Sequence, residues 1–173
     1  LAMRSGLPVS HFIAACNIND VVSGYLDSGR LEPRQAVPTW SNAMDVGDPG
    51  NFVRILELFG HDHEAIKNNL SAFAADDDET LDTIRSVYNE TGYLADPHGA
   101  VGYLALKQYL DQHPGQKGIF LETAHPVKFP GAVESATGRP VDYPPTVRDL
   151  MLRAGKSIEI KPEYSALKDY LVS

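Results

Sequence analysis

Phe12-Ile13-Ala14-Ala15-Cys16-Asn17-Ile18-Asn19-Asp20 is the stretch that decides the fold class of this 173-residue chain. Residues 10–16 form a short apolar run between turn-forming residues, which predicts a buried strand. The polar turn at residues 17–20 then leads into an expected helix that continues through Leu26 and ends at Gly29. Strand, polar turn and helix together form the unit from which α/β sheets are built, and ligands bind such sheets where the strands end.

Helical spacing of apolar residues between capping residues predicts most of the remaining elements. The expected helices begin at Asp48-Pro49, span His63 to Ala74 and Asp76 to Glu90, begin again at Asp96-Pro97, follow Pro144-Pro145, and span Tyr164 to Leu171. A second buried strand is expected over residues 117–122, and residues 157–160 are expected to be extended. Residues 30–50 are expected to form a long, ordered connection. The sequence therefore predicts a helix-rich α/β fold with fewer strands than an ordinary sheet contains.

Charge and composition exclude several classes of function. The chain has 15 Lys and Arg against 23 Asp and Glu, a net charge of −8, and no stripe rich in Lys and Arg. We therefore expect no nucleic-acid partner and no binding to anionic membranes. The sequence has neither a long apolar run nor a signal-peptide layout, and its single cysteine, Cys16, allows no intramolecular disulfide. These features favour a cytoplasmic protein in which Cys16 fills core space.

Few motifs indicate a chemistry from the residues alone. The segment His61-Asp62-His63-Glu64 contains four groups that can bind a metal, but its histidines would lie about 200° apart on a helix, so no metal site is expected. Thr123 and His125 form a hydroxyl and a base two residues apart, a spacing that rarely allows activation of the hydroxyl, and no orienting acid is evident. Composition and spacing alone indicate an acidic α/β protein of unassigned chemistry.

A resemblance to a known family carries the interpretation further. It rests on residues 12–20, on Ser41-Asn42-Ala43-Met44-Asp45 followed by Asn51-Phe52, on Asp96 to Gly102, and on Leu121-Glu122-Thr123-Ala124-His125-Pro126-Val127-Lys128-Phe129. In this order they resemble the C-terminal part of threonine synthase, and the similarity extends over essentially the whole chain. The family has the tryptophan-synthase-β-like fold (fold type II) of enzymes that use pyridoxal 5'-phosphate, and it converts O-phosphohomoserine and water to L-threonine and phosphate.

The resemblance also implies a domain assignment. Residues 1–173 would form the C-terminal part of the large domain that binds pyridoxal phosphate, with a helical extension from about residue 140 to residue 173. The family's imine lysine and phosphate-binding loop would lie before Leu1, so no catalytic residue is expected in this chain. Lys107 and Lys128 do not stand in the imine motif. We therefore expect these residues alone to be inactive.

The same resemblance places Thr123 at the cofactor, with its hydroxyl hydrogen-bonded to the pyridine nitrogen, and makes Ser41 a second cofactor-binding candidate. For Asn42, Asp45 and Asn51 two roles stay open: they orient the substrate, or they only stabilise their loop. The roles of Asn17, His98 and His125 also stay open between structure and catalysis. One residue departs from the family's pattern, because Glu122 stands where glycine is expected. Its carboxylate would either crowd the ring or point into solvent.

Two alternatives to the catalytic interpretation remain. The chain could be a binding or regulatory domain that has the same fold without chemistry, or part of another fold type II enzyme that acts on a different amino acid. The sequence does not indicate the oligomeric state.

Overall fold

The computed structural model describes residues 2–173, which divide into one compact unit that ends at Val141 and a second unit, Asp142–Ser173. The first unit contains two parallel strands, β1 (Phe12–Asn17) and β2 (Leu70–Ala75). They pair in register from Phe12 opposite Leu70 to Asn17 opposite Ala75. Both strands therefore end at the same edge of the sheet.

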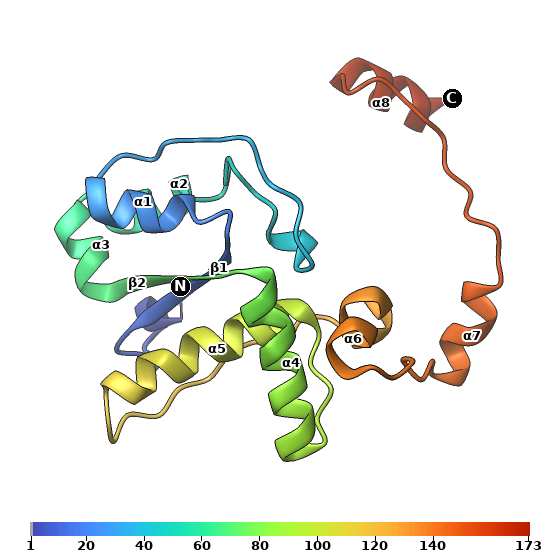
Figure 1. The fold of residues 1–173 in the computed structure, drawn as a ribbon. Coiled ribbons are helices and arrows are strands. Elements are labelled where there is room, and N and C mark those ends of the chain that lie inside the picture. The colour runs from blue at the N-terminus through green and yellow to red at the C-terminus, as the bar shows by residue number, and fades with distance from the viewer. Residues whose placement is uncertain (1) are drawn as a thin grey trace. The chain divides into compact units, whose positions relative to one another are not determined.

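Helices cover both faces of this small sheet (Figure 1). On one face lie α1 (Val21–Ser28), α2 (Val53–Leu58) and α3 (His63–Asn69). On the other face lies α5 (Pro97–Gln112), against which α4 (Asp77–Thr91) packs, and α6 (Pro130–Thr137) packs on α4. Short 3-10 turns occur at Met3–Ser5, Asn42–Met44 and Pro126–Lys128. This layering agrees with the α/β class that the sequence predicts.

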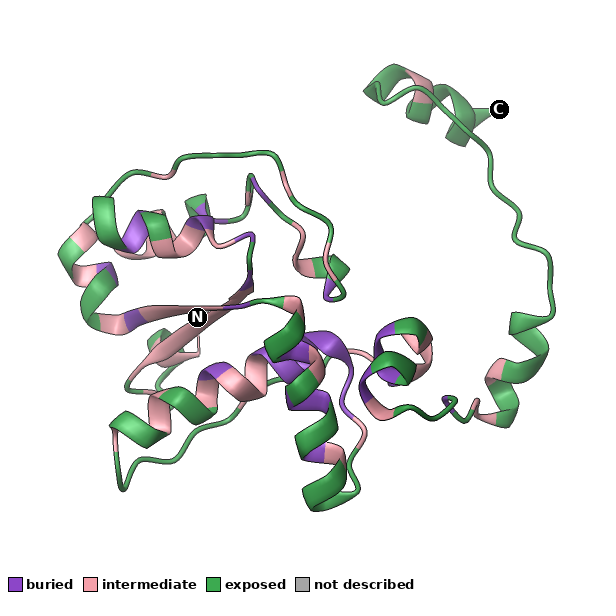
Figure 2. Ribbon diagram, in the orientation of Figure 1, coloured by how far each residue is buried: buried purple, intermediate pink, exposed green. Residues whose placement is uncertain are grey.

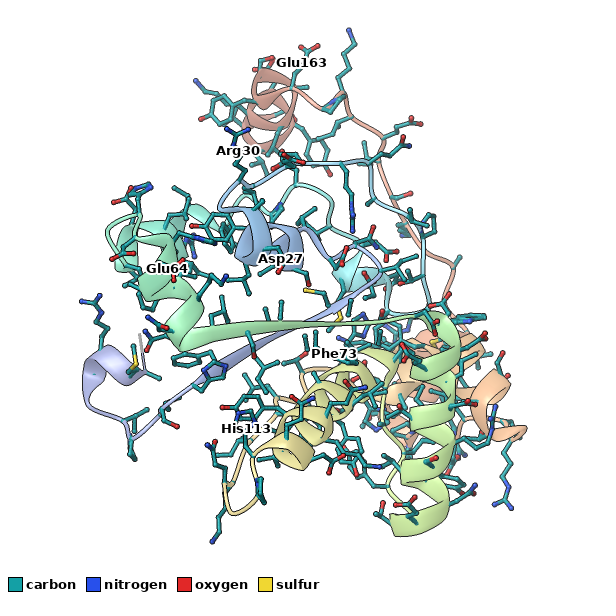
Figure 3. The ribbon with its side chains drawn as sticks, turned by 60° about the vertical axis from the view of Figure 1, so that its left-hand side comes forward. Asp27, Arg30, Glu64, Phe73, His113 and Glu163 are labelled. Atoms are coloured by element: carbon teal, nitrogen blue, oxygen red, sulfur yellow. The ribbon has the colours of Figure 1, made fainter. Side chains whose placement is uncertain are left out.

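The core contains two clusters of buried apolar residues, and Figure 2 colours all buried residues purple. The first lies between the sheet and its upper helices and contains Tyr25, Leu26, Phe52, Ile66 and Leu70. The second, which contains Ile84, Ala100 and Ala136, lies where α4, α5 and α6 meet. Alternation along β2 turns Phe73 to the opposite side of the sheet from Leu70, toward α5 (Figure 3).

The second unit consists of α7 (Pro145–Met151) and α8 (Tyr164–Val172) with an exposed connection between them. Within it, the Arg148 guanidinium pairs with the Asp142 carboxylate at 3.0 Å. Both helices occur where the sequence predicts them, and most of their apolar side chains are exposed. In residues 2–173, no helix combines the length and the apolar character needed to span a membrane.

Two predicted helices differ from the structure. The helix expected over residues 63–74 ends at Asn69, and the next residues form β2. Leu-Ser-Ala-Phe-Ala-Ala is a short apolar run that fits a strand as well as a helix, and pairing with β1 selects the strand. The helix expected from Asp48-Pro49 begins only at Val53, after a turn in which the Phe52 N–H donates to the Pro49 carbonyl.

The second predicted strand is also wrong. Residues 117–122 pair with no strand in the described part of the chain, and Ile119 and Leu121 are 90% and 78% exposed. The segment nevertheless alternates in burial, because Phe120, Glu122 and Ala124 are partly buried whereas the residues between them are exposed. It is therefore an extended segment with one face on α5 and an outer face that includes Thr123.

Candidate functional site

A hydrogen-bonded network follows the carboxyl end of β1. Its centre is Asn17, which is 1% exposed. The Asn17 amide nitrogen lies 2.8 Å from Thr39 Oγ1, 2.8 Å from Asp45 Oδ1 and 3.1 Å from Ser41 Oγ. Because an amide has only two hydrogens, these acceptors share them. The polar turn that the sequence places after the strand thus holds the residue 39–45 loop against the sheet edge.

Asn19 and Asp45 extend this network. The Asn19 side chain accepts from the Val37 N–H at 2.7 Å and donates to the Val37 carbonyl at 2.9 Å. Asp45 Oδ1 also accepts from Thr39 Oγ1 at 2.7 Å, and its Oδ2 accepts from the Thr39 N–H at 3.0 Å. Each carboxylate oxygen of Asp45 therefore has a donor inside the protein, which suits a residue that stabilises the loop.

The N-terminus of α5 contacts the same loop through His98. The Ala43 N–H donates to His98 Nε2 at 3.1 Å, and His98 Nδ1 lies 2.6 Å from Asp96 Oδ1. Since Nε2 accepts a hydrogen bond, the proton of the neutral ring is on Nδ1 and is donated to Asp96. The ring is 8% exposed and lies against the Phe129 ring, with 4.6 Å between the ring centroids.

Glu122 contacts the same helix end from the extended segment. The Asp96 N–H donates to Glu122 Oε1 at 3.1 Å, and the carboxyl group occupies the space beside Gly99 where any Cβ would overlap it. Glu122 therefore points into the protein, neither into solvent nor toward the exposed side of Thr123. A glycine at position 99 is needed because the carboxyl group approaches the helix backbone closely.

The pKa values of the two carboxyl groups are shifted in opposite directions, although burial acts to raise both. It raises the pKa of Glu122 to about 7, and the neighbouring Asp96 carboxylate adds to that rise. Burial also acts to raise the pKa of Asp96, but hydrogen bonds from the His98 ring and backbone outweigh it and leave this pKa below its ordinary value. Asp96 is therefore the ionised member of the pair.

The predicted site residues fall into two groups in the structure. Ser41 is fully buried in the Asn17 network and Asp45 is partly buried there, whereas the side chains of Thr123, Asn42 and Asn51 are exposed. Contacts of the α5 N-terminus with Ala43 and Glu122 connect the loop that contains Ser41 to the segment that contains Thr123. Asn51 lies outside both sets of contacts, in the turn before α2.

Sequence reasoning left other members of the site unassigned. Thr39, Asn19 and Asp96 were expected only as loop or capping residues, yet each makes hydrogen bonds that define the site. A cluster of Asn and Asp directly after a buried strand is the signal that indicates such a network. His125 was left open, and its Nδ1 accepts from the Val127 N–H at 3.1 Å, which caps the following turn.

The other reactive residues have structural surroundings. Burial raises the pKa of the Cys16 thiol to about 11, so the thiol stays protonated at neutral pH and is a poor nucleophile. In the segment His61-Asp62-His63-Glu64, the Asp62 carboxylate caps α3 by accepting a hydrogen bond from the Ala65 N–H at 3.0 Å. The His63 ring lies 3.0 Å from the Leu26 carbonyl. No group of three or more metal-binding side chains is found in residues 2–173.

Comparison with known proteins gives consistent results. A family model described as threonine synthase, C-terminal, matches residues 99–171. The threonine synthase of Escherichia coli K12 is 39% identical over 173 residues, which are all of this chain and 40% of that protein. The chain thus spans about 40% of the length of this curated relative.

Solved structures of threonine synthases match the fold as well. The crystal structure of the Escherichia coli enzyme matches with a TM-score of 0.87 at 39% identity, over 99% of this chain and 39% of that one. A threonine synthase from Brucella melitensis with bound PLP matches with a TM-score of 0.80 at 33% identity, over 98% of this chain and 41% of that one.

Proposed function

We propose, from its similarity to threonine synthases, that the chain forms one wall of the active site of an enzyme that uses pyridoxal phosphate. The reaction converts O-phosphohomoserine and water to L-threonine and phosphate. One observation carries this proposal: hydrogen bonds join the stretches that resemble the family, although these lie far apart in sequence. Asn17 binds Asp45 at the end of β1, and the N-terminus of α5 binds both Ala43 and Glu122.

The residues present fit the cofactor at Thr123. Thr123 lies on the exposed face of the extended segment, while Glu122 beside it turns inward onto Asp96. Bound pyridoxal phosphate supplies an electron sink for carbanion chemistry on an amino-acid substrate. A neutral hydroxyl at the pyridine nitrogen does not hold that nitrogen protonated as a carboxylate does, so Thr123 moderates the sink.

The residue 39–45 loop has a supporting role in this proposal. The Ser41 hydroxyl accepts a hydrogen bond from Asn17 and Ser41 is fully buried, so Ser41 stabilises the loop. A contact between Ser41 and the cofactor stays a prediction. Asp45 stabilises the same loop. Asn42 in this loop is exposed, and it is the loop residue that would contact a substrate. Asn51 is exposed outside the network, and a substrate contact at Asn51 stays a prediction.

The proposal extends to the organisation of the whole enzyme. The imine lysine and the phosphate-binding loop are assigned to the part of the family that this chain does not span, so these 173 residues alone would not turn over substrate. Residues up to about 140 would belong to the large domain and the rest to its helical extension. A cytoplasmic enzyme is supported by the single cysteine, which allows no intramolecular disulfide.

The test uses the intact protein with pyridoxal phosphate and O-phosphohomoserine. Equimolar release of threonine and phosphate is expected, and phosphate without threonine would refute the reaction. Thr123→Val removes the hydroxyl but preserves the shape of the side chain, so it should change both the cofactor absorbance and the turnover. The matched control is Thr146→Val at an exposed threonine of α7, which should change neither. Identical behaviour of the two variants would remove Thr123 from the cofactor site.

A further inference from the structure

We propose that Glu122 is a neutral carboxylic acid that donates its proton to Asp96, and that this bridge fixes the His98 tautomer that holds the residue 41–45 loop. The proposal concerns positioning residues, and its catalytic consequence rests on the proposed function. Glu122 is also the position at which the chain departs from the glycine that the family resemblance predicts.

The first argument is a pair of buried oxygens. Asp96 Oδ2 and Glu122 Oε2 are both buried and have no hydrogen-bond partner among the described residues. Each belongs to a neighbouring carboxyl group, because the Asp96 N–H binds the other oxygen of Glu122. A single proton between Oε2 and Oδ2 satisfies both atoms, whereas two adjacent carboxylates would repel each other and leave both unpaired.

The position of that proton follows from the other contacts. Glu122 Oε1 accepts from the Asp96 N–H, so the acidic hydrogen of Glu122 is on Oε2. Asp96 Oδ1 accepts both from the His98 N–H at 2.8 Å and from the His98 ring at 2.6 Å. Asp96 is therefore a carboxylate with three donors, and the raised pKa of Glu122 agrees with its neutral form.

His98 transmits this arrangement to the loop. Its Nδ1–H is directed at Asp96, which leaves the Nε2 lone pair to accept from the Ala43 N–H. The other tautomer would place a hydrogen on Nε2 against the Ala43 N–H, and the loop would lose this contact. Ala43 lies between Ser41 and Asp45, so the hydrogen bond fixes the loop at its middle.

The titratable groups that face the bridge are few. From α5 and its cap they are His98 and Asp96. Tyr93 precedes this cap, and its pKa is raised by burial and by the charges of Glu122 and Asp96. The extended segment contributes Glu122 itself. The 41–45 loop and the turn before α6 meet the His98 ring through the Ala43 backbone and the Phe129 ring, which are uncharged.

Raising the pH therefore breaks the bridge at Glu122. Loss of its proton converts a hydrogen bond into repulsion between two carboxylates, and burial places this change near neutral pH. The expected result is a looser 41–45 loop above that pH. The Glu122→Gln substitution keeps a donor at the Oε2 position at every pH, because the amide group replaces the carboxylic hydroxyl.

The experiment measures the bridge directly by NMR in the intact protein labelled with ¹⁵N in histidine and ¹³C in the glutamate carboxyl group. At pH 6 we expect the Nδ1–H tautomer of His98 and a protonated Glu122, with the Glu122 carbon titrating near neutral pH. An Nε2–H tautomer, or a Glu122 that is ionised at pH 6, would overturn the proposal. This measurement needs no variant and no turnover.

Variants then test the consequence for the reaction. Glu122→Ala removes the donor, so it should lower kcat/KM by about tenfold at pH 6.5 and mix the His98 tautomers. Glu122→Gln should keep kcat/KM within about twofold and lose the decline of kcat/KM above neutral pH. Glu90→Gln, the same substitution at an exposed side chain, should leave the pH profile unchanged. Equal profiles for all three variants would overturn the positioning role. Missing threonine formation together with the expected His98 tautomer would refute the proposed function and support the bridge.

Discussion

Replacing Asn17 with aspartate tests whether the network after β1 holds the loop in place. The change keeps the size and shape of the side chain and converts its two-hydrogen donor into an acceptor. Asn17 is 1% exposed, and its amide nitrogen lies 2.8 Å from the Asp45 carboxylate. The variant therefore loses the donors to Thr39, Ser41 and Asp45 and places a second carboxylate beside the first.

The expected cost has two parts. Loss of hydrogen bonds to buried acceptors, one of them charged, lowers the free energy of unfolding by about 3 kcal/mol. Two full charges at the 2.8 Å separation would repel by ~6 kcal/mol at an effective dielectric constant of about 20. Protonation of one carboxyl group limits that second part. We expect a total loss of about 4 kcal/mol at pH 7 and at least ~1 kcal/mol less at pH 5.

The assay is urea unfolding followed by two signals. Far-UV circular dichroism reports on the whole chain, and Trp40, the single tryptophan, reports on the loop next to Ser41. The matched control is Asn68→Asp at an exposed position of α3, which should cost less than about 0.5 kcal/mol. A loss for Asn17→Asp that equals the control, or that does not depend on pH, would refute the network as a stabilising unit.

Two further predictions concern the contribution of single side chains to stability. The pKa of Glu122 is raised from 4.5 to about 7, so the folded state binds more protons than the unfolded state between these pH values. The free energy of unfolding should therefore fall by ~1 kcal/mol as the pH rises through this range, a value reduced for the partial exposure of the group. Urea titrations at several pH values should show this decline in the native protein and lose it in Glu122→Gln; the same slope in both would contradict the assignment. Asp76 forms a capping box with Glu79 at the start of α4, so Asp76→Ala should lower the thermal unfolding free energy by about 1 kcal/mol. Asp78→Ala, two residues further along and outside the capping box, should cost less than half as much. Equal losses would show that the cap contributes nothing.

Local signals in the sequence were sufficient for much of the fold. The capping residues Asp76 and Asp96 mark the starts of α4 and α5, and Gly29 and Gly92 end α1 and α4 in the left-handed conformation. These elements are determined by side chains within a few residues of their ends, so a linear sequence contains the information needed to predict them. The β1 strand and the helix that follows it were predicted on the same basis.

Pairing and burial over long separations required the tertiary structure. Residues 70–75 form a strand because β1 lies beside them, and residues 117–122 pair with no strand in the described residues although their composition is apolar. Glu122 is the sharpest case. The sequence left open whether its carboxylate crowds a ring or faces solvent, and in the structure the carboxyl group lies against Asp96 and Gly99.

The sequence by itself determined the α/β class, the positions of most helix ends and the stretches that resemble the family, because these depend on local spacing and residue type. Only the tertiary structure decided that Glu122 turns onto Gly99 and Asp96, and that Ala43 binds His98. The physical reason is that a buried carboxyl group takes its protonation state from neighbours far away in the chain. The charge of Glu122 is therefore a property of the folded protein.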